Sequence, residues 1–208
     1  MTTDATKAYQ LIKEKIISLE LAPGAVIQDA ALTEELGLGR TPIREALKLL
    51  EAENLVVTVP RRGIFVAHVS ITDLQQLCEI RTELEGLSAR LAAQRATEAE
   101  IASLLQCCED LPLEVAERTL QRLELDRRLH RGLASASHNR FLEVEVLRLY
   151  DLSLRLWHLA LARMQAEDIS MASHRRIIDA VAARDADRAE EYMQAHIRDF
   201  QQRVKAAM

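Results

Sequence analysis

The stretch from residue 32 to residue 50 constrains the fold of this chain more than any other part of its sequence. Its second half has apolar residues at positions i, i+3, i+4 and i+7, a spacing that lines them up along one face of a helix. Thr41, Arg44 and Lys48 fall on the opposite face, and Arg40 joins them from the first turn. The apolar positions are Ile43, Ala46, Leu47 and Leu50. We therefore predict a short helix that buries an apolar stripe and exposes a basic one.

A second predicted helix precedes the basic one. Residues 29–36 have leucines four positions apart, and Gly-Leu-Gly at 37–39 forms a short turn. Pro42 lies in the first turn of the basic helix, where its missing N–H costs nothing, and either Gly39 or Thr41 can be the N-cap. The two segments together have the pattern of a helix-turn-helix, whose second helix contacts base edges of DNA.

Two β-branched runs follow these helices. Residues 55–59 and 64–66 have the composition of strands, and Pro-Arg-Arg-Gly at 60–63 supplies a basic tip that contains glycine. Asn54 suits a left-handed position at the end of the preceding helix. The runs predict a hairpin, the wing of a winged helix.

The exposed face of the basic helix suits contact with DNA. The planar fork of Arg donors fits guanine or phosphate, whereas Thr and Lys suit phosphate. An ordinary amphipathic helix with a solvated charged face is the alternative. The helix before the glycine turn and the hairpin after the basic helix favour DNA binding.

The net charge of -5 limits how DNA is held. Residues 1–70 contain 8 basic and 9 acidic side chains, and residues 71–208 contain 19 and 23. Neither half is a basic polyelectrolyte, so bulk attraction to phosphate is weak and the few basic side chains must act as a local patch. Sequence-specific binding by a dimer fits this charge better than non-specific coating.

Helical periodicity replaces strand-like alternation near residues 69–73, where Ser70 or Thr72 can cap the next helix. Further helix starts follow at Thr97-Glu-Ala-Glu100, a capping box, and at Pro112, Asn139, Ser170 and Asp185-Ala-Asp187. We therefore expect a mainly α protein. Residues 1–70 form a winged helix-turn-helix domain, and residues 71–208 form an antiparallel bundle of about six helices.

No segment has the pattern of a signal peptide or a membrane span, which predicts a cytoplasmic protein with no membrane partner. The three cysteines lack Cys-x-x-Cys spacing and are expected to be reduced thiols, mostly buried. They are Cys78, Cys107 and Cys108.

Four side chains in the second half are candidate metal ligands. Asp126 and His130 are four residues apart, so they face the same way on one helix, and His174 and His196 lie on two later helices. Helical bundles build metal sites from facing helices, and three imidazoles with one carboxylate suit zinc, nickel or manganese. Taken singly, each histidine also fits a surface or capping position.

Residues 8–69 resemble the DNA-binding domain of the GntR family of bacterial transcription regulators. The resemblance is carried by Leu-Gly before the turn, by Arg40 to Leu47, and by the Arg-Gly of the wing. It implies DNA contacts by Arg40, Thr41 and Arg44 and, at the wing, by Arg61, Arg62 and Gly63. The chain departs from the family at Gly39, usually Ser, at Asn54, usually Gly, and at Ala30 and Ala31, which are charged in some members.

Residues 73–204 resemble the FCD effector domain of the FadR-type subfamily, an all-helical bundle. The matching segments are Arg81-Thr-Glu-Leu-Glu85, Asp126 to His130, His174 to Ala180, and Met193-Gln-Ala-His196. All four ligand positions of that domain are filled, so the resemblance implies a bound divalent metal.

Arg81 has two interpretations. Four protein ligands leave about two positions on a six-coordinate metal for a carboxylate, and Arg81 can clamp the other end of such an effector. The alternative is an intrahelical salt bridge between Arg81 and Glu85.

Together these features predict a homodimeric transcription regulator, commonly a repressor in this family, that binds operator DNA and responds to a small carboxylate. A metal-dependent enzyme is the rival, but no nucleophile motif or additional base is marked near the ligands. Because these catalytic features are missing from the sequence pattern, we expect a protein that is not an enzyme. A purely structural metal is the third alternative.

Overall fold

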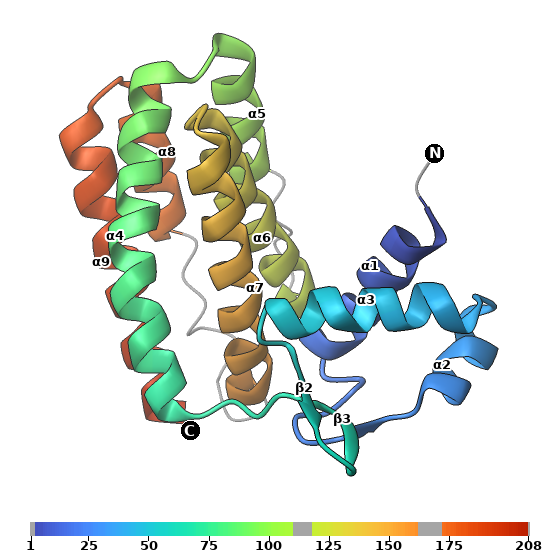
Figure 1. The fold of residues 1–208 in the computed structure, drawn as a ribbon. Coiled ribbons are helices and arrows are strands. Elements are labelled where there is room, and N and C mark those ends of the chain that lie inside the picture. The colour runs from blue at the N-terminus through green and yellow to red at the C-terminus, as the bar shows by residue number, and fades with distance from the viewer. Residues whose placement is uncertain (1–2, 110–117, 162–171, 208) are drawn as a thin grey trace. The chain divides into compact units, whose positions relative to one another are not determined.

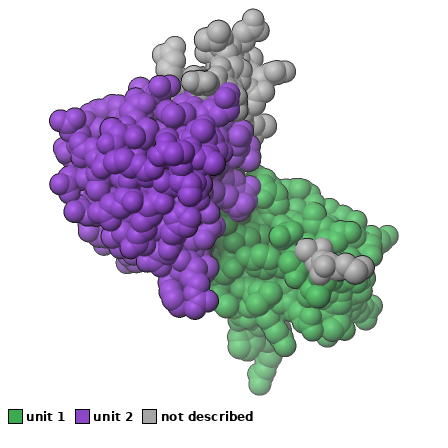
Figure 2. All heavy atoms as spheres, turned by 90° about the horizontal axis from the view of Figure 1, so that it is seen from above, with its two compact units in different colours: residues 1–70, 151–159 green, residues 71–150, 160–208 purple. Residues whose placement is uncertain are grey.

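The computed structural model describes residues 3–109, 118–161 and 172–207, which form nine helices and one three-stranded sheet (Figure 1). They divide into two compact units, coloured separately in Figure 2. The first unit contains residues 1–70 and 151–159, and the second contains 71–150 and 160–208. The predicted class, a winged helix-turn-helix followed by a helical bundle, is confirmed.

The first unit is built on three helices, α1 (Asp4–Ile17), α2 (Asp29–Leu36) and α3 (Arg40–Ala52). The predicted apolar stripe of α3 is buried, and α3 packs mainly against α1. Ile12 and Ile16 of α1 are fully buried. Each such side chain stabilises the unit by about 1.5–3 kcal/mol, so the core fixes which face of α3 remains exposed.

The turn between α2 and α3 has the geometry expected for its glycines. Helix α2 ends at Gly37, whose φ of 63° is left-handed, and Gly39 is the N-cap of α3. Asn54 has a φ of 63° just after α3, as its position predicted. Left-handed geometry strains most side chains but suits Gly and Asn.

The sheet has the strand order β1-β3-β2 and is antiparallel throughout. Strands β2 (Val56–Val59) and β3 (Gly63–Val66) form the predicted hairpin, with Val57 opposite Phe65. Strand β1 (Val26–Ile27) was not predicted, because two residues carry no periodic pattern and their pairing with β3 is long-range.

Lys13 joins two parts of the first unit through a partly buried network of charges. Its Nζ lies 2.8 Å from a carboxylate oxygen of Glu53 and 2.8 Å from one of Asp151. Burial opposes a positive charge there, but the Asp151 and Glu53 carboxylates outweigh burial and raise the pKa of Lys13 above its ordinary value. The network fixes the end of α3 to residues 151–159 within this unit.

Six helices make up the second unit, and α4 packs along α9 in the opposite direction. Arg81 of α4 lies near Phe200 of α9, while Arg90 Nη1 lies 2.7 Å from the carboxylate of Glu190. Helices α6 and α8 pack against α4, α8 also packs against α9, and α5 packs against α6 and α8. Their bounds are α4 (Ile71–Arg95), α5 (Glu98–Glu109), α6 (Arg118–Ala136), α7 (Arg140–Leu161), α8 (Ala172–Ala182) and α9 (Ala186–Ala207). Residues 151–159 of helix α7 belong to the first unit, and the rest of the helix belongs to the second.

The predicted helix starts are observed wherever the structure describes them. Thr97 and Glu100 form the reciprocal bonds of a capping box, and the side chains of Asn139 and Asp185 accept from backbone N–H groups of α7 and α9. Pro112 and Ser170 lie outside the described residues.

No helix in the described ranges is long and apolar enough to cross a bilayer. The three cysteines are free, and two of them, Cys78 and Cys107, are buried, as expected. Burial raises the pKa of the Cys78 thiol to about 11, which keeps it protonated and unreactive at neutral pH.

Candidate functional site

The side chains predicted to contact DNA are all exposed on the first unit. They are Arg40, Thr41, Arg44 and Lys48 on α3, Arg61 and Arg62 at the tip between β2 and β3, and Gly63 at the start of β3. Arg44 is 67% exposed, and its Nε donates to Asp29 Oδ2 at 2.8 Å. These residues are therefore accessible to solvent, and the Asp29 carboxylate at the start of α2 orients Arg44.

The wing tip holds an arginine in a backbone conformation that favours glycine. Arg61 has a φ of 61° and follows Pro60 in a tight turn closed by a bond from Arg62 N–H to Val59 O of 3.0 Å. A non-glycine residue in this region is strained by about 1–2 kcal/mol.

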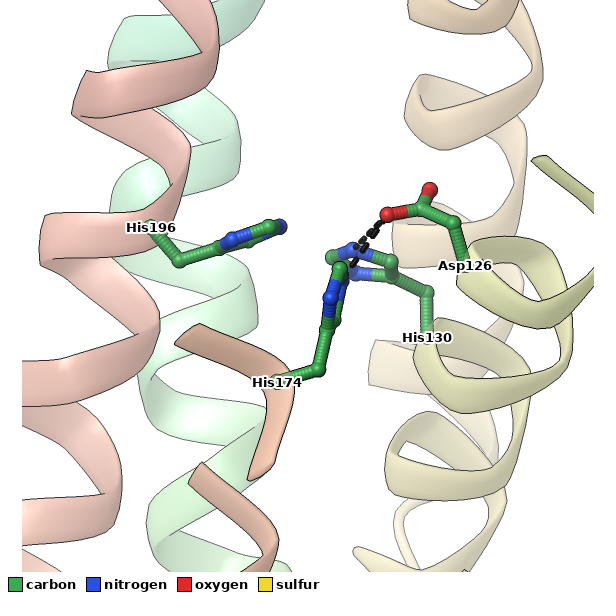
Figure 3. Close-up of side chains that lie close together, drawn as sticks. All are labelled: Asp126, His130, His174 and His196. Carbon is green, nitrogen blue, oxygen red and sulfur yellow. Dashed lines mark ion pairs between the residues drawn. The ribbon is translucent and has the colours of Figure 1, made fainter. Parts of the chain in front are cut away.

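Five helices of the second unit converge on the four predicted metal ligands. Asp126 and His130 come from α6, His174 comes from the start of α8, and His196 comes from α9 (Figure 3). Each residue offers one ligand atom, and these atoms all lie within 4.8 Å of one another. Helices α4 and α7 complete the surroundings through Glu85 and Tyr150. We call Asp126, His130, His174 and His196 the histidine cluster.

Asp126 lies at the centre of the cluster's contacts. Its Oδ1 is 2.9 Å from His174 Nε2 and 3.7 Å from His130 Nε2, while its Oδ2 accepts a hydrogen bond of 2.6 Å from the Tyr150 hydroxyl. His174 is buried, yet neither of its ring nitrogens has hydrogen-bond geometry to any described residue. The close approach of His174 to Asp126 is thus an ion-pair distance without a hydrogen bond.

The other two histidines each have a partner at Nδ1. His130 Nδ1 contacts Glu85 Oε2, and His196 Nδ1 lies 3.0 Å from the Ser173 hydroxyl. The residues supporting the cluster, Glu85, Tyr150 and Ser173, were not singled out as its partners from the sequence. Glu85 and His130 are 45 positions apart, so no local pattern marks their contact.

Burial and neighbouring charges set the protonation of the cluster. Burial alone would raise the pKa of Asp126, but His130 and His174 hold it well below its ordinary value. Burial, together with the nearby His174 and His130, lowers the pKa of His196 well below its usual range. For His130, burial is outweighed by the carboxylates of Glu85 and Asp126, which raise its pKa to about 9. Asp126 is therefore ionised and His196 neutral, the states in which both groups bind metals.

Arg81 is buried beside the cluster, only 3% exposed, and its Nε lies 2.5 Å from Glu85 Oε1. Its guanidinium also lies over the rings of Tyr150 and Phe200, 5.3 and 5.4 Å from their centroids. The intrahelical salt bridge, one of the two sequence-based interpretations of Arg81, is thus present.

A hollow of about 260 Å³ between α8 and α9 is lined by His196 of the cluster and by its neighbour Ser173. Arg176 and Tyr192 lie at its border, with the guanidinium 4.3 Å from the centroid of the ring. Among the four residues of the cluster, only His196 lines the hollow.

The residues present fit a divalent transition metal. Three imidazoles and one carboxylate form a donor set common for such ions, and the buried His174 has ring nitrogens without hydrogen bonds. A buried polar group normally has a partner, and a metal ion held by all four side chains would supply one. It would act there as a Lewis acid toward an anionic ligand.

Comparison with known protein families matches both units. The FCD domain matches residues 76–199, and the family described as "Bacterial regulatory proteins, gntR family" matches residues 4–66. The two matches follow one another along the chain without overlap.

Similar proteins span most of this chain. The Nta operon transcriptional regulator of Aminobacter aminovorans is 32% identical over 87% of this chain and 85% of its own length. The HTH-type transcriptional repressor GlaR of Escherichia coli is 28% identical over 95% of this chain and 94% of its own length. Among solved structures, E. coli McbR/YncC has the same fold, with a TM-score of 0.83, 24% identity, and coverage of 97% of this chain and 99% of its own.

Proposed function

This chain belongs to the GntR family of bacterial regulatory proteins and has an FCD domain, and from that premise we propose a repressor controlled by a small organic acid at a metal site. The similar protein of Aminobacter aminovorans is named a transcriptional regulator, and GlaR of Escherichia coli is named a transcriptional repressor. A DNA-binding role without enzymatic activity is consistent with both matches. The sites within the chain are argued below from its own contacts.

The observation that carries the proposal is the histidine cluster. Four residues from three helices, distant in sequence, offer ligand atoms within 4.8 Å of one another in the interior of a bundle. Burying imidazoles and a carboxylate in an apolar core is unfavourable unless each is paired. A single divalent ion bound by Asp126, His130, His174 and His196 would pair them all.

The effector we propose carries a carboxylate. In a six-coordinate site the cluster leaves two positions open, and carboxylate oxygens are suitable ligands for them. The hollow that ends at His196 supports access for a small acid. Arg81 remains our proposed second contact, because its salt bridge uses Nε and the guanidinium has four further N–H donors.

The proposed DNA-binding surface is the exposed face of α3 together with the wing. We propose that Arg40 and Arg44 contact bases or phosphates in the major groove, that Thr41 and Lys48 contact phosphates, and that the wing tip contacts the backbone. The salt bridge of Arg44 to Asp29 is exposed enough to exchange for a contact with DNA.

We propose that the protein is a homodimer joined through α4 and α7 of the second unit. Ile80 and Leu87 of α4 and Phe141 and Val144 of α7 are exposed apolar side chains, with Phe141 71% and Val144 63% exposed. Leu84 of α4 and Leu147 of α7 pack against one core cluster, which is formed by Ala134, Leu142 and Val146. Apolar patches of this kind commonly mark protein interfaces. A two-fold dimer would place two winged helices on a near-palindromic operator.

A gel-shift titration with DNA flanking the gene tests this function. We expect saturable binding to one near-palindromic segment, and a shift of about 5–150-fold in affinity when the metal-loaded protein receives its organic acid. A panel of mono- and dicarboxylates, with matched amides as controls, identifies the effector class. The absence of any sequence-specific complex would contradict the proposal.

A further inference from the structure

Glu85 is buried beside the histidine cluster, although its side chain is not one of the four ligands. It is 1% exposed on α4 and contacts Nδ1 of His130, which comes from α6. The other nitrogen of that ring, Nε2, faces Asp126 Oδ1 at 3.7 Å. His130 therefore lies between two carboxylates, one at each nitrogen.

The partners of Glu85 determine what it can do for His130. Its second oxygen, Oε1, accepts from Arg81 Nε at 2.5 Å, so a buried cation balances its charge. An ionised carboxylate only accepts hydrogen bonds. The proton of the contact must therefore be on His130 Nδ1, and a neutral imidazole protonated there has its free lone pair on Nε2.

We infer that Glu85 is a positioning residue of the metal site: it holds His130 with Nδ1 protonated and Nε2 directed toward the ion bound by the rest of the cluster. This inference rests on the proposed metal site. A carboxylate behind a metal-binding histidine fixes the tautomer and the ring orientation and raises the basicity of the ligand. Arg81 then acts on the site through Glu85, in addition to any contact with an effector.

The other two histidines are not held in this way. His196 Nδ1 faces the Ser173 hydroxyl, which can donate or accept and so does not fix which nitrogen carries the proton. His174 has no hydrogen bond at either nitrogen among the described residues. Only for His130 does the described structure show a partner that dictates the tautomer.

Glu85→Gln tests the inference, since the amide has nearly the same shape but can donate as well as accept. Zinc affinity, measured by competition with a chromophoric chelator, should fall about 10–100-fold. The control is Glu83→Gln, an exposed residue on the same helix, which should bind zinc like the wild type. Equal zinc affinity of the Glu85→Gln and wild-type proteins would overturn the inference.

A second variant covers the case in which Glu85→Gln leaves Arg81 unpaired and misfolds. Arg81→Met with Glu85→Gln removes the buried pair together, and circular dichroism reports whether the bundle is retained. The folded double variant should also lose zinc affinity about 10–100-fold. Retention of wild-type affinity would refute the role of Glu85.

Nitrogen-15 NMR of the zinc-loaded proteins reads the tautomer directly. The wild type should show a slowly exchanging His130 Nδ1–H proton, and in Glu85→Gln that proton should exchange faster. A His130 that is metal-bound through Nδ1 in the wild type would contradict the inference even though zinc binds. Failure of the wild type to bind zinc at all would instead remove the proposed metal site.

Discussion

Helix α3 exposes its functional side chains on the surface of the first unit, whereas the histidine cluster lies in the interior of the second. In α3 the apolar residues face inward, and the polar residues proposed to contact DNA are exposed. In the second unit the polar residues of the cluster face inward, and His130 and His174 are buried. One unit carries its chemistry on its surface, and the other carries it in its interior.

The difference decides how function is coupled to stability. Exposed Arg and Lys side chains remain hydrated and need no protein partner, whereas a buried polar group is costly unless it is paired. Two polar side chains of the bundle have such partners: Asp126 is paired with Tyr150, and Arg81 is paired with Glu85. Substitutions on α3 should therefore separate function from folding, while those in the bundle should affect both unless the charges remain balanced.

The largest effect is expected inside the bundle. His174→Ala combined with His196→Ala removes two of four proposed ligands, and we expect co-purifying metal, measured by inductively coupled plasma mass spectrometry, to be lost. His68→Ala with His138→Ala is the matched control, because both of these histidines are exposed outside the cluster. Full metal occupancy in the His174 and His196 variant would refute the site.

Substitutions on the exposed apolar face of α4 and α7 should also change function without changing folding, as we expect for the surface of α3. Phe141→Glu with Val144→Glu puts charge on the proposed dimer face, and the dimer should dissociate at least about 100-fold more readily in sedimentation equilibrium. Helicity should be unchanged, since both side chains are exposed. Glu145→Ala, exposed on the same helix, is the control, and a dimer of normal stability in the double variant would place the interface elsewhere.

Arg44→Ala should weaken operator binding by about 10–100-fold, corresponding to about 1–3 kcal/mol, because it removes a base or phosphate contact. The free energy of unfolding should change by less than about 0.5 kcal/mol, since the side chain is exposed. Lys7→Ala removes one exposed positive charge on α1, which is not among the proposed DNA contacts, and it should leave affinity nearly unchanged. Unaltered binding by Arg44→Ala, measured by fluorescence anisotropy, would remove Arg44 from the interface.

The smallest effect is expected at the wing. Arg61→Gly relieves a left-handed arginine, so thermal unfolding should show unchanged stability or a gain of up to about 1 kcal/mol. Operator affinity should fall a few-fold, and its dependence on salt should become shallower by about one unit in the logarithmic slope. A loss of stability together with full affinity would mean that Arg61 serves the turn rather than DNA.

The same contrast explains what the sequence could predict. The stripe of α3 and the capping box at Thr97 and Glu100 depend on near neighbours in the chain, so periodicity and spacing locate them. The hairpin strands were predictable for the same reason. Strand β1 was not, because its pairing with β3 joins residues almost forty positions apart.

The metal site was predictable only in part. Asp126 and His130 share a helical face by spacing, whereas their approach to His174 and His196 depends on tertiary packing and was expected from a family resemblance. Glu85 and Tyr150, which hold His130 and Asp126, come from other helices and carry no sequence signal of that role. For Arg81 the spacing to Glu85 allowed the salt bridge, but only the structure shows that both side chains are buried.

Anomalous X-ray diffraction from crystals of the zinc-loaded protein, collected above and below the zinc edge, tests the central claim most directly. We predict one strong anomalous peak per chain, within bonding distance of Asp126, His130, His174 and His196. A crystal grown with the effector should show a carboxylate oxygen completing the coordination. Anomalous density elsewhere in the chain, or none at the cluster under saturating zinc, would contradict the account.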